Sequence, residues 1–276
     1  MRPFGERVVQ AVQDTGPLCV GVDPSPSLLE EWGIPDDATG LADFSSRCIE
    51  ALAGAVPVVK PQVAFFERHG AAGMAALERL LADAASAGLL VIADAKRGDI
   101  GSTTAAYADA WFRSPFAGDA LTATPYVGLG ALEPLCAAAR ETGCGVFVVV
   151  ATSNPEGRAL QAAVRADGAT VECALLAEIA ACNAAERAET GALIGSLGAV
   201  VGATRRDLPL EQLGGVLLVP GLGAQGGSVD DVAAGFGTCP RGTVLPSTSR
   251  GLLRAGPSAL RAAALRLRDE LAGSLR

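Results

Sequence analysis

Short apolar segments recur along the chain and alternate with stretches rich in alanine and leucine. The apolar segments have no alternating polar face, which is typical of parallel strands covered on both sides. The intervening stretches carry apolar residues at helical spacing. The pattern therefore predicts strands at residues 18–22, 56–59, 89–93, 119–124, 145–151, 199–201, 216–219 and 243–245, with helices at 73–85, 132–139, 174–187 and 258–271.

Eight strands alternating with helices favour an α/β fold of the (β/α)8 TIM-barrel type, and 276 residues is a typical size for it. A doubly wound open sheet is the main rival on pattern alone. No linker or shift in composition divides the chain, so we expect residues 1–276 to form a single barrel domain.

Composition narrows the possible partners. With 50% apolar and 19% charged residues the chain should fold as a compact globule. The 30 acidic and 22 basic residues give a net charge of −8, which disfavours nucleic acid and anionic membranes as partners. No segment approaches the roughly 18 apolar residues that a membrane span needs. We expect a cytoplasmic protein.

Cysteine and histidine content restricts the chemistry. The seven cysteines are odd in number and include no C-x-x-C pair, so we expect free thiols in a reducing compartment. His69 is the only histidine, which excludes zinc sites built on several histidines and leaves one imidazole for any catalytic triad. We expect His69 to be structural or solvent-facing.

Charged residues follow the first three predicted strands, where barrels place their chemistry. Asp23 follows the first strand and Lys60 the second, and Asp94, Lys96 and Asp99 follow the third. The last four are two lysines and two aspartates. Asp94 and Lys96 stand two apart, so an extended strand would point both into the barrel mouth, where the four groups would form one close array. A solvated ion-pair cluster is the alternative, but charges directly after a buried strand need partners. Flanking carboxylates keep Lys96 protonated, so Lys96 can act as a general acid that protonates a carbanion.

A second set of residues suits phosphate. The glycine-rich segment 220–227 follows the predicted seventh strand, and its backbone N–H groups can approach an anion closely. Arg250 follows the eighth strand and supplies a cation. Barrels commonly bind phosphate through the loops after strands seven and eight, so together these residues predict a phosphate site.

The segment Asp94-Ala95-Lys96-Arg97-Gly98-Asp99-Ile100 resembles the D-x-K-x-x-D-I signature of the orotidine 5′-phosphate decarboxylase family. Residues 19–24, 58–62, 151–155 and 220–227 resemble further segments of that family in the same order. The residues Lys96-Arg97-Gly98-Asp99 are similar to those of the longer bacterial branch of this family. Strand eight matches least well, because Pro246 and Thr248 depart from the expected pattern.

The resemblance implies decarboxylation of orotidine 5′-monophosphate to uridine 5′-monophosphate and CO2, in de novo pyrimidine biosynthesis, with neither cofactor nor metal. Lys96 would stabilise and protonate the carbanion at C6 of the pyrimidine. Asp94 would lie beside the departing carboxylate and hold Lys96, while Lys60 would orient Asp94 and reach the ribose.

The resemblance also implies a set of substrate contacts and a homodimer in which Asp99 and Thr103 reach the partner's site. Asp23 would bind ribose hydroxyls and Ser153 the pyrimidine amide. The phosphate would be held by Gln225, Arg250 and the backbone of Gly251. The full set of implied substrate-binding residues is Asp23, Ile100, Thr103, Ser153, Pro220, Gln225, Arg250 and Gly251.

Three other functions stay open. A magnesium-dependent sugar-phosphate decarboxylase or aldolase of the same superfamily would need a carboxylate where Lys60 stands, since an ammonium repels the cation. A Schiff-base enzyme would need a neutral amine, which Asp94 and Asp99 oppose. A non-catalytic phosphate-ligand sensor would keep the fold without turnover.

Overall fold

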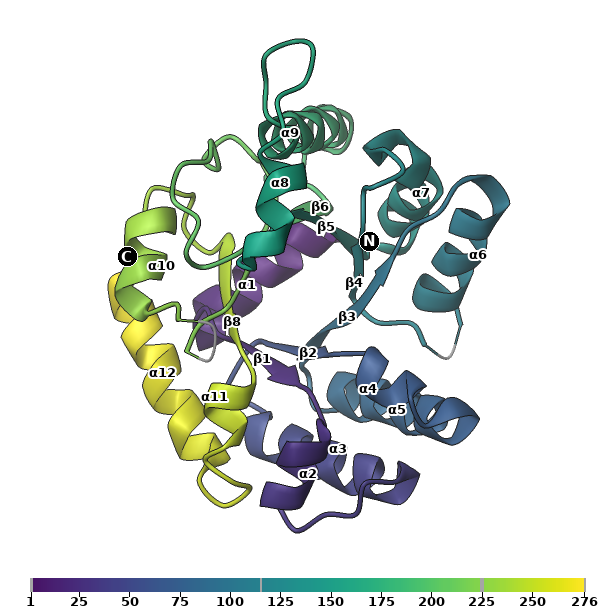
Figure 1. The fold of residues 1–276 in the computed structure, drawn as a ribbon, viewed down its shortest axis with the longest axis vertical. Helices are drawn as coiled ribbons and strands as arrows, with labels where there is room; N and C mark the ends of the chain where they lie inside the picture. Colours follow the sequence, from purple (N-terminus) through teal and green to yellow (C-terminus); the bar gives the residue numbers. More distant parts are fainter. Residues whose placement is uncertain (1, 115, 224–225, 276) are drawn as a thin grey trace.

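The computed structural model describes residues 2–114, 116–223 and 226–275, and eight parallel strands within them form a closed barrel (Figure 1). Each strand pairs with the next in sequence, and β1 closes the barrel by pairing with β8. The predicted (β/α)8 fold is confirmed, and each predicted strand overlaps an observed one. The strands are β1 (Cys19–Val22), β2 (Val58–Pro61), β3 (Leu90–Arg97), β4 (Ala120–Ala123), β5 (Gly145–Ala151), β6 (Leu197–Val201), β7 (Leu217–Pro220) and β8 (Val244–Thr248).

Long helices surround the barrel, and short ones follow the strand ends (Figure 1). The surrounding helices are α3 (Ala38–Leu52), α5 (Gly70–Ser86), α6 (Gly101–Phe112), α7 (Glu133–Thr142), α9 (Val171–Thr190), α10 (Val229–Phe236) and α12 (Leu260–Ser274). The short ones are α2 (Pro26–Glu31), α4 (Ala64–Glu67), α8 (Arg158–Gln161), α11 (Arg250–Leu253) and the 3-10 turns η1 (Leu129–Leu132) and η2 (Pro155–Gly157). The four predicted helices correspond to α5, α7, α9 and α12.

One connection departs from the predicted alternation of strand and helix. Residues 202–216, all of them described, join β6 to β7 without a helix. Pro209 has no amide hydrogen to donate, and Gly214 and Gly215 favour turns over a helix. Leu210 and Leu213 are each 2% exposed, so this loop still contributes apolar side chains to the outer layer of the core.

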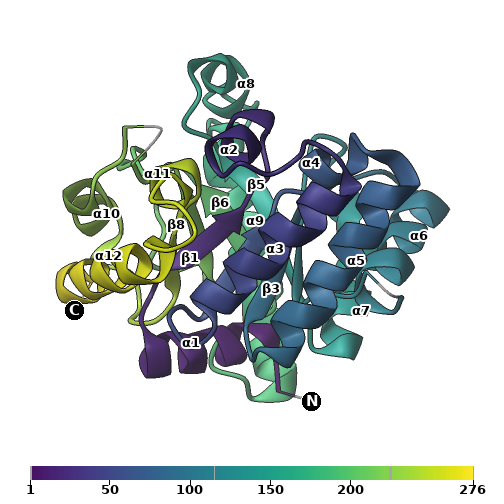
Figure 2. The ribbon, with the colours of Figure 1, turned by 90° about the horizontal axis from the view of Figure 1, so that it is seen from below.

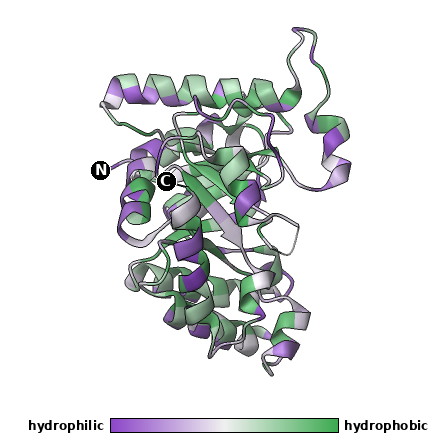
Figure 3. Ribbon diagram, turned by 90° about the vertical axis from the view of Figure 1, so that its left-hand side faces the viewer, coloured by the Kyte–Doolittle hydropathy of each residue, from purple (hydrophilic) through white to green (hydrophobic). Residues whose placement is uncertain are grey.

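The helix α1 (Phe4–Thr15) closes the barrel at the amino ends of its strands (Figure 2). Its buried residues pack with inward-facing side chains of all eight strands. The Phe4 ring meets Phe147 of β5 edge-on, with ring centroids 5.7 Å apart. A Cβ atom at Gly145 would lie 2.2 Å from the Phe4 ring, so glycine is required where α1 crosses that strand. The strands at the centre of the molecule are coloured as predominantly hydrophobic in Figure 3.

The carboxyl ends of the strands lie on the side opposite α1, together with α2, α8 and α11 (Figure 2). None of the helices in the described ranges is long and apolar enough to cross a membrane. The seven cysteines are free thiols, and four of them are buried. Because α1 covers the amino ends of the strands, the carboxyl ends are where a ligand can enter the barrel.

Replacing Phe4 tests the closure by α1. Phe4→Ala should lower the free energy of unfolding by about 3–5 kcal/mol, because it leaves a cavity against Phe147. Phe4→Leu keeps most of the volume and should cost less than about 1.5 kcal/mol. Urea denaturation followed by circular dichroism measures both, and equal losses would contradict the packing role of the ring.

Candidate active site

The carboxyl end of β3 contains a bulge. Regular pairing with β4 is interrupted between Ala93 and Arg97, so residues 94–96 lie opposite the single residue Thr122. Within the described ranges Lys96 is the only non-glycine residue with positive φ, at 48°. Bulges beside active sites re-aim a side chain. Asp94 and Lys96 do face the same cavity, but an irregular backbone rather than the expected strand alternation brings them there.

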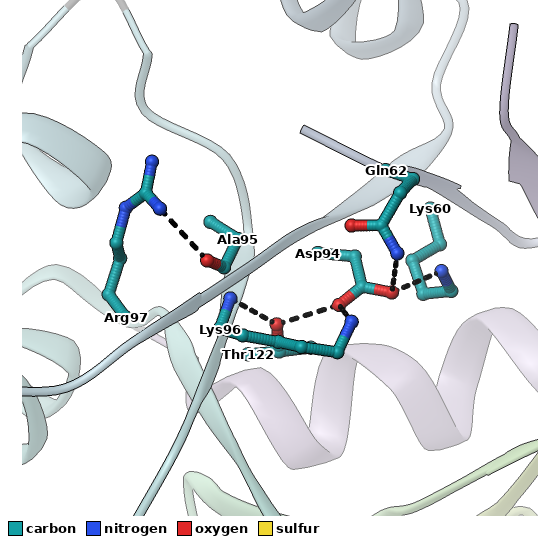
Figure 4. A network of polar contacts seen from close by, with 7 residues as sticks. All are labelled: Lys60, Gln62, Asp94, Ala95, Lys96, Arg97 and Thr122. Atoms are coloured by element: carbon teal, nitrogen blue, oxygen red, sulfur yellow. Dashed lines mark hydrogen bonds and ion pairs between the residues drawn. The ribbon is translucent and has the colours of Figure 1, made fainter. Parts of the chain in front are cut away.

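Four side chains donate hydrogen bonds to the Asp94 carboxylate (Figure 4). Lys60 Nζ lies 2.6 Å and Gln62 Nε2 3.2 Å from Oδ2. Lys96 Nζ lies 2.6 Å and Thr122 Oγ1 2.9 Å from Oδ1. Each carboxylate oxygen therefore has one ammonium and one neutral donor.

The charged groups differ in their exposure to the cavity. Asp94 is 7% and Lys60 6% exposed, whereas the Lys96 side chain is 52% exposed. Burial opposes the charged form of Asp94, but the Lys60 and Lys96 ammonium groups outweigh it and hold the pKa of Asp94 well below its usual range. Burial likewise opposes the Lys60 ammonium, but Asp94 and Asp23 keep the pKa of Lys60 above its usual value. The fixed ion pair thus lies beneath an ammonium that a ligand can reach.

These groups lie in a cavity of about 310 Å³ at the carboxyl ends of the strands. Its walls come from most strands of the barrel, with apolar side chains such as Val149 and Leu218 between the polar ones. Of the residues predicted for the site, the cavity wall includes Asp23, Lys60, Asp94, Lys96, Ser153, Pro220 and Arg250.

The wall formed by β1 and β8 carries polar groups suited to an anionic ligand. Asp23 Oδ1 and Ser249 Oγ are buried with no hydrogen-bond partner within the described ranges. Among the described residues, the Arg250 guanidinium likewise has no ion-pair partner. Buried polar atoms are nearly always satisfied, so Asp23 and Ser249 indicate a ligand site, and the exposed Arg250 adds a positive charge at its edge.

The loop after β7 is held at its base. Thr248 Oγ1 donates to the Leu222 carbonyl at 3.0 Å, and the Gly223 N–H donates to the Gly227 carbonyl at 2.8 Å. Gly223 has φ of 81°, a conformation that favours glycine. The predicted phosphate contact Gln225 lies outside the described residues. Gly251 is exposed in α11 and is not part of the cavity wall.

Asp99, Ile100 and Thr103 do not reach the cavity of their own chain. The Asp99 carboxylate accepts the Ile100 N–H at 2.8 Å, and Ile100 is 62% exposed. The expected array of four charges within one chain is therefore wrong for Asp99. The backbone leaves β3 close to Thr124 at Gly98, and Asp99 lies in the connection between β3 and α6, outside the cavity wall.

Sequence reasoning missed Gln62, Thr122 and Ser249. Gln62 follows Lys60 by two residues, a spacing that could have indicated a shared face. Thr122 is a lone hydroxyl in an apolar strand, and Ser249 precedes Arg250. The partner of Gln62 and Thr122 is Asp94 on a neighbouring strand, so only the fold shows that contact. Among the described residues, no group of three His, Cys, Asp or Glu side chains is placed to hold a metal ion.

Comparison with known proteins gives consistent matches over nearly the whole chain. The family model described as orotidine 5′-phosphate decarboxylase / HUMPS family matches residues 16–265. The orotidine 5′-phosphate decarboxylase of Streptomyces coelicolor is 52% identical, covering 98% of each chain. That of Corynebacterium efficiens is 49% identical, covering 92% of this chain and 91% of the relative. A crystal structure from Streptomyces avermitilis has a TM-score of 0.93 at 51% identity and covers 100% of this chain and 96% of that chain.

The family match, the two relatives and the clamped Asp94 at the mouth of a closed barrel agree with one another. The chain belongs to the orotidine 5′-phosphate decarboxylase / HUMPS family.

Proposed function

We infer that the protein converts orotidine 5′-monophosphate to uridine 5′-monophosphate and CO2, a step of pyrimidine nucleotide synthesis. The observation that carries this inference is the Asp94 carboxylate held between Lys60 and Lys96 in the cavity. The family and its relatives named for this activity support the same reaction.

The reaction creates charge on carbon and then neutralises it. The bond between C6 and the substrate carboxylate breaks, CO2 leaves and the electron pair stays on C6. The Lys96 ammonium stabilises that pair and donates a proton to C6, and the resulting neutral amine regains a proton from water. Asp94 holds Lys96 beside the departing carboxylate, and Lys60 fixes Asp94 from below.

The remaining polar groups of the cavity would bind the rest of the nucleotide. Asp23, with its unpartnered Oδ1, suits the ribose hydroxyls, and Ser153 suits the pyrimidine amide. Arg250 in the cavity wall would hold the phosphate, joined by Gln225 and by the backbone of Gly251, which is next to Arg250 in α11, while Pro220 contributes to the cavity wall beside the nucleotide. Charge-assisted hydrogen bonds to phosphate are strong and directional, so this wall supplies much of the affinity.

The same geometry disfavours the magnesium-dependent alternative. Both oxygens of Asp94 already accept hydrogen bonds, and two ammonium groups lie 2.6 Å from them. A divalent cation at Asp94 would meet both positive charges. The charged cluster is therefore suited to chemistry without a metal.

We propose further that the protein acts in the cytoplasm as a homodimer in which Asp99 and Thr103 reach the partner's cavity. Gly98 lies close to Thr124, so the connection that carries the exposed Ile100 starts beside the segment that follows β4. In that segment Tyr126 is 80% exposed, and large apolar side chains grouped at a surface favour association.

Lys96→Ala should lower kcat by at least about 10³-fold, because it removes both the proton donor and the cation beside C6. Loss of ultraviolet absorbance from orotidine 5′-monophosphate, with no added metal, measures the rate. Excess chelator should leave the wild-type rate unchanged. A Lys96→Ala enzyme of near wild-type rate would refute the proposed role, and wild-type activity that needs added magnesium would refute the metal-free reaction.

Arg250→Ala should raise KM by about 10- to 100-fold with a smaller change in kcat, as expected for loss of a charge-assisted phosphate contact. Arg254→Ala is the matched control, since Arg254 lies one helical turn further along, with its side chain 61% exposed. Steady-state kinetics compare the two. An unchanged KM in Arg250→Ala, or an equal increase in both variants, would contradict the assignment.

A mixture of Asp99→Ala and Lys96→Ala chains should recover activity, because a mixed dimer can contain one site with both residues intact. The expected recovery approaches about one quarter of wild-type activity per chain at equal mixing, the statistical share of such sites for a two-fold dimer. Native mass spectrometry verifies subunit exchange. Exchange without recovered activity would rule out a shared site.

A further inference from the structure

We propose that Thr122 is a positioning residue for the reaction, and that its hydroxyl holds the Lys96 backbone and the Asp94 carboxylate in register with one another. The proposal deepens the inferred decarboxylation and rests on it. Thr122 lies on β4, is 1% exposed, and reaches both groups through one oxygen atom.

The direction of each hydrogen bond to Thr122 is fixed by its partner. The ionised Asp94 can only accept, so the hydroxyl proton of Thr122 points to Asp94 Oδ1 at 2.9 Å. The Lys96 backbone N–H can only donate, so it uses a lone pair of the same Oγ1 at 3.0 Å. Donating to one partner leaves the oxygen free to accept from the other. Replacing Thr122 by a residue without a hydroxyl group therefore removes both hydrogen bonds at once.

The Lys96 backbone depends on such a bond. Its φ of 48° places it in the left-handed region, which is unfavourable for a residue with a Cβ atom. The bulge also leaves residues 94–96 facing Thr122 alone, where the regular β3–β4 ladder is interrupted. The Thr122 hydroxyl supplies the acceptor for the Lys96 N–H, and so stabilises the conformation that aims the Lys96 side chain at Asp94.

The other face of the bulge is fixed independently. The Arg97 guanidinium donates to the Ala95 carbonyl at 3.1 Å and forms an ion pair with Glu67. It also lies 5.7 Å from the centroid of the Trp111 ring. Figure 4 shows Arg97 on the side of β3 away from Lys60 and Gln62. Arg97 therefore holds the bulge from outside the barrel, and Thr122 holds it from the cavity.

Loss of the hydroxyl should affect turnover more than binding. Lys96 Nζ must lie within reach of both Asp94 and C6 of the substrate, and relaxation of its backbone would move it away from that position. The proposed phosphate contact Arg250 follows β8, which lies across the barrel from β4 in the strand order. Affinity for the nucleotide should therefore change little.

The test compares three variants of the full-length protein. Thr122→Val keeps the β-branched shape and should lower kcat by about 10- to 100-fold, with KM and the Kd for uridine 5′-monophosphate changed by less than about threefold. Thr122→Ser restores the hydroxyl and should recover most of kcat. Thr243→Val is the matched control, because Thr243 is 2% exposed and its hydroxyl donates to the Pro240 carbonyl at 2.6 Å, at the amino end of the barrel. It should lose stability without losing kcat.

A crystal structure of Thr122→Val gives a readout that does not depend on activity. We expect Lys96 to leave the left-handed region, or its Nζ to move beyond hydrogen-bond distance of Asp94 Oδ1. If the valine variant does not fold, Thr122→Ala replaces it with the same expectations, since alanine places no methyl group against the carboxylate.

Wild-type kcat in the hydroxyl-free variant, or an unmoved Lys96 in its crystal structure, would overturn the proposal, as would a serine variant as slow as the valine variant. Failure of the inferred reaction is a separate result, because it would appear as wild-type protein that does not consume orotidine 5′-monophosphate.

Discussion

Transfer of the Asp94 carboxylate from water into the barrel costs several kcal/mol, and the hydrogen bonds and charges around it must offset that cost. Lys60 and Lys96 supply the opposite charges, while Gln62 and Thr122 satisfy the remaining acceptor positions. Removing one partner of such a buried pair typically costs about 3–5 kcal/mol, because the other charge stays behind unpaired. The carboxylate thereby fixes the relative positions of β2, β3 and β4 at the mouth of the cavity.

The cavity separates two tasks between its walls. The wall from β2 to β4 holds fixed charges that suit a developing carbanion, whereas the wall from β7 to β1 holds Arg250, Ser249 and Asp23 beside the glycine-rich loop. Binding energy gained from a phosphate and a ribose can hold the pyrimidine against the charged wall, where only the transition state gains from the contact. The division explains how a small site can hold a large polar substrate by one end and act on a single bond at the other.

The strands could be predicted because their residues are buried on both faces, so apolar runs mark them directly. The ends of strand β8 are predicted least well, because Pro246 interrupts the apolar pattern. In the structure Pro246 lies within the strand and pairs with Val219. Asp94, Lys96 and Lys60 could be predicted from their places after strands and from the family motif.

Other features leave no trace in the periodicity of the sequence. Nothing in the sequence distinguishes a lysine with left-handed backbone conformation from one in an extended strand. The bulge at residues 94–96 could therefore not be predicted. The role of Thr122 depends on a neighbouring strand, and the destination of Asp99 is not visible within one chain. The connection between β6 and β7 contains no helix, because its proline and glycine residues disfavour one. A prediction based only on the alternation of strands and helices does not consider these residues.

The helix at the amino end, α1, has a consequence for biosynthesis. Phe4 and Val8 of α1 are synthesised before any strand of the barrel, yet they pack against residues of all eight strands, and β1 completes its pairing only with β8. Contacts of such long sequence separation form slowly and late. The apolar residues of α1 therefore lack part of their packing partners until β8 has been synthesised, so this segment is exposed to non-native contacts during that time.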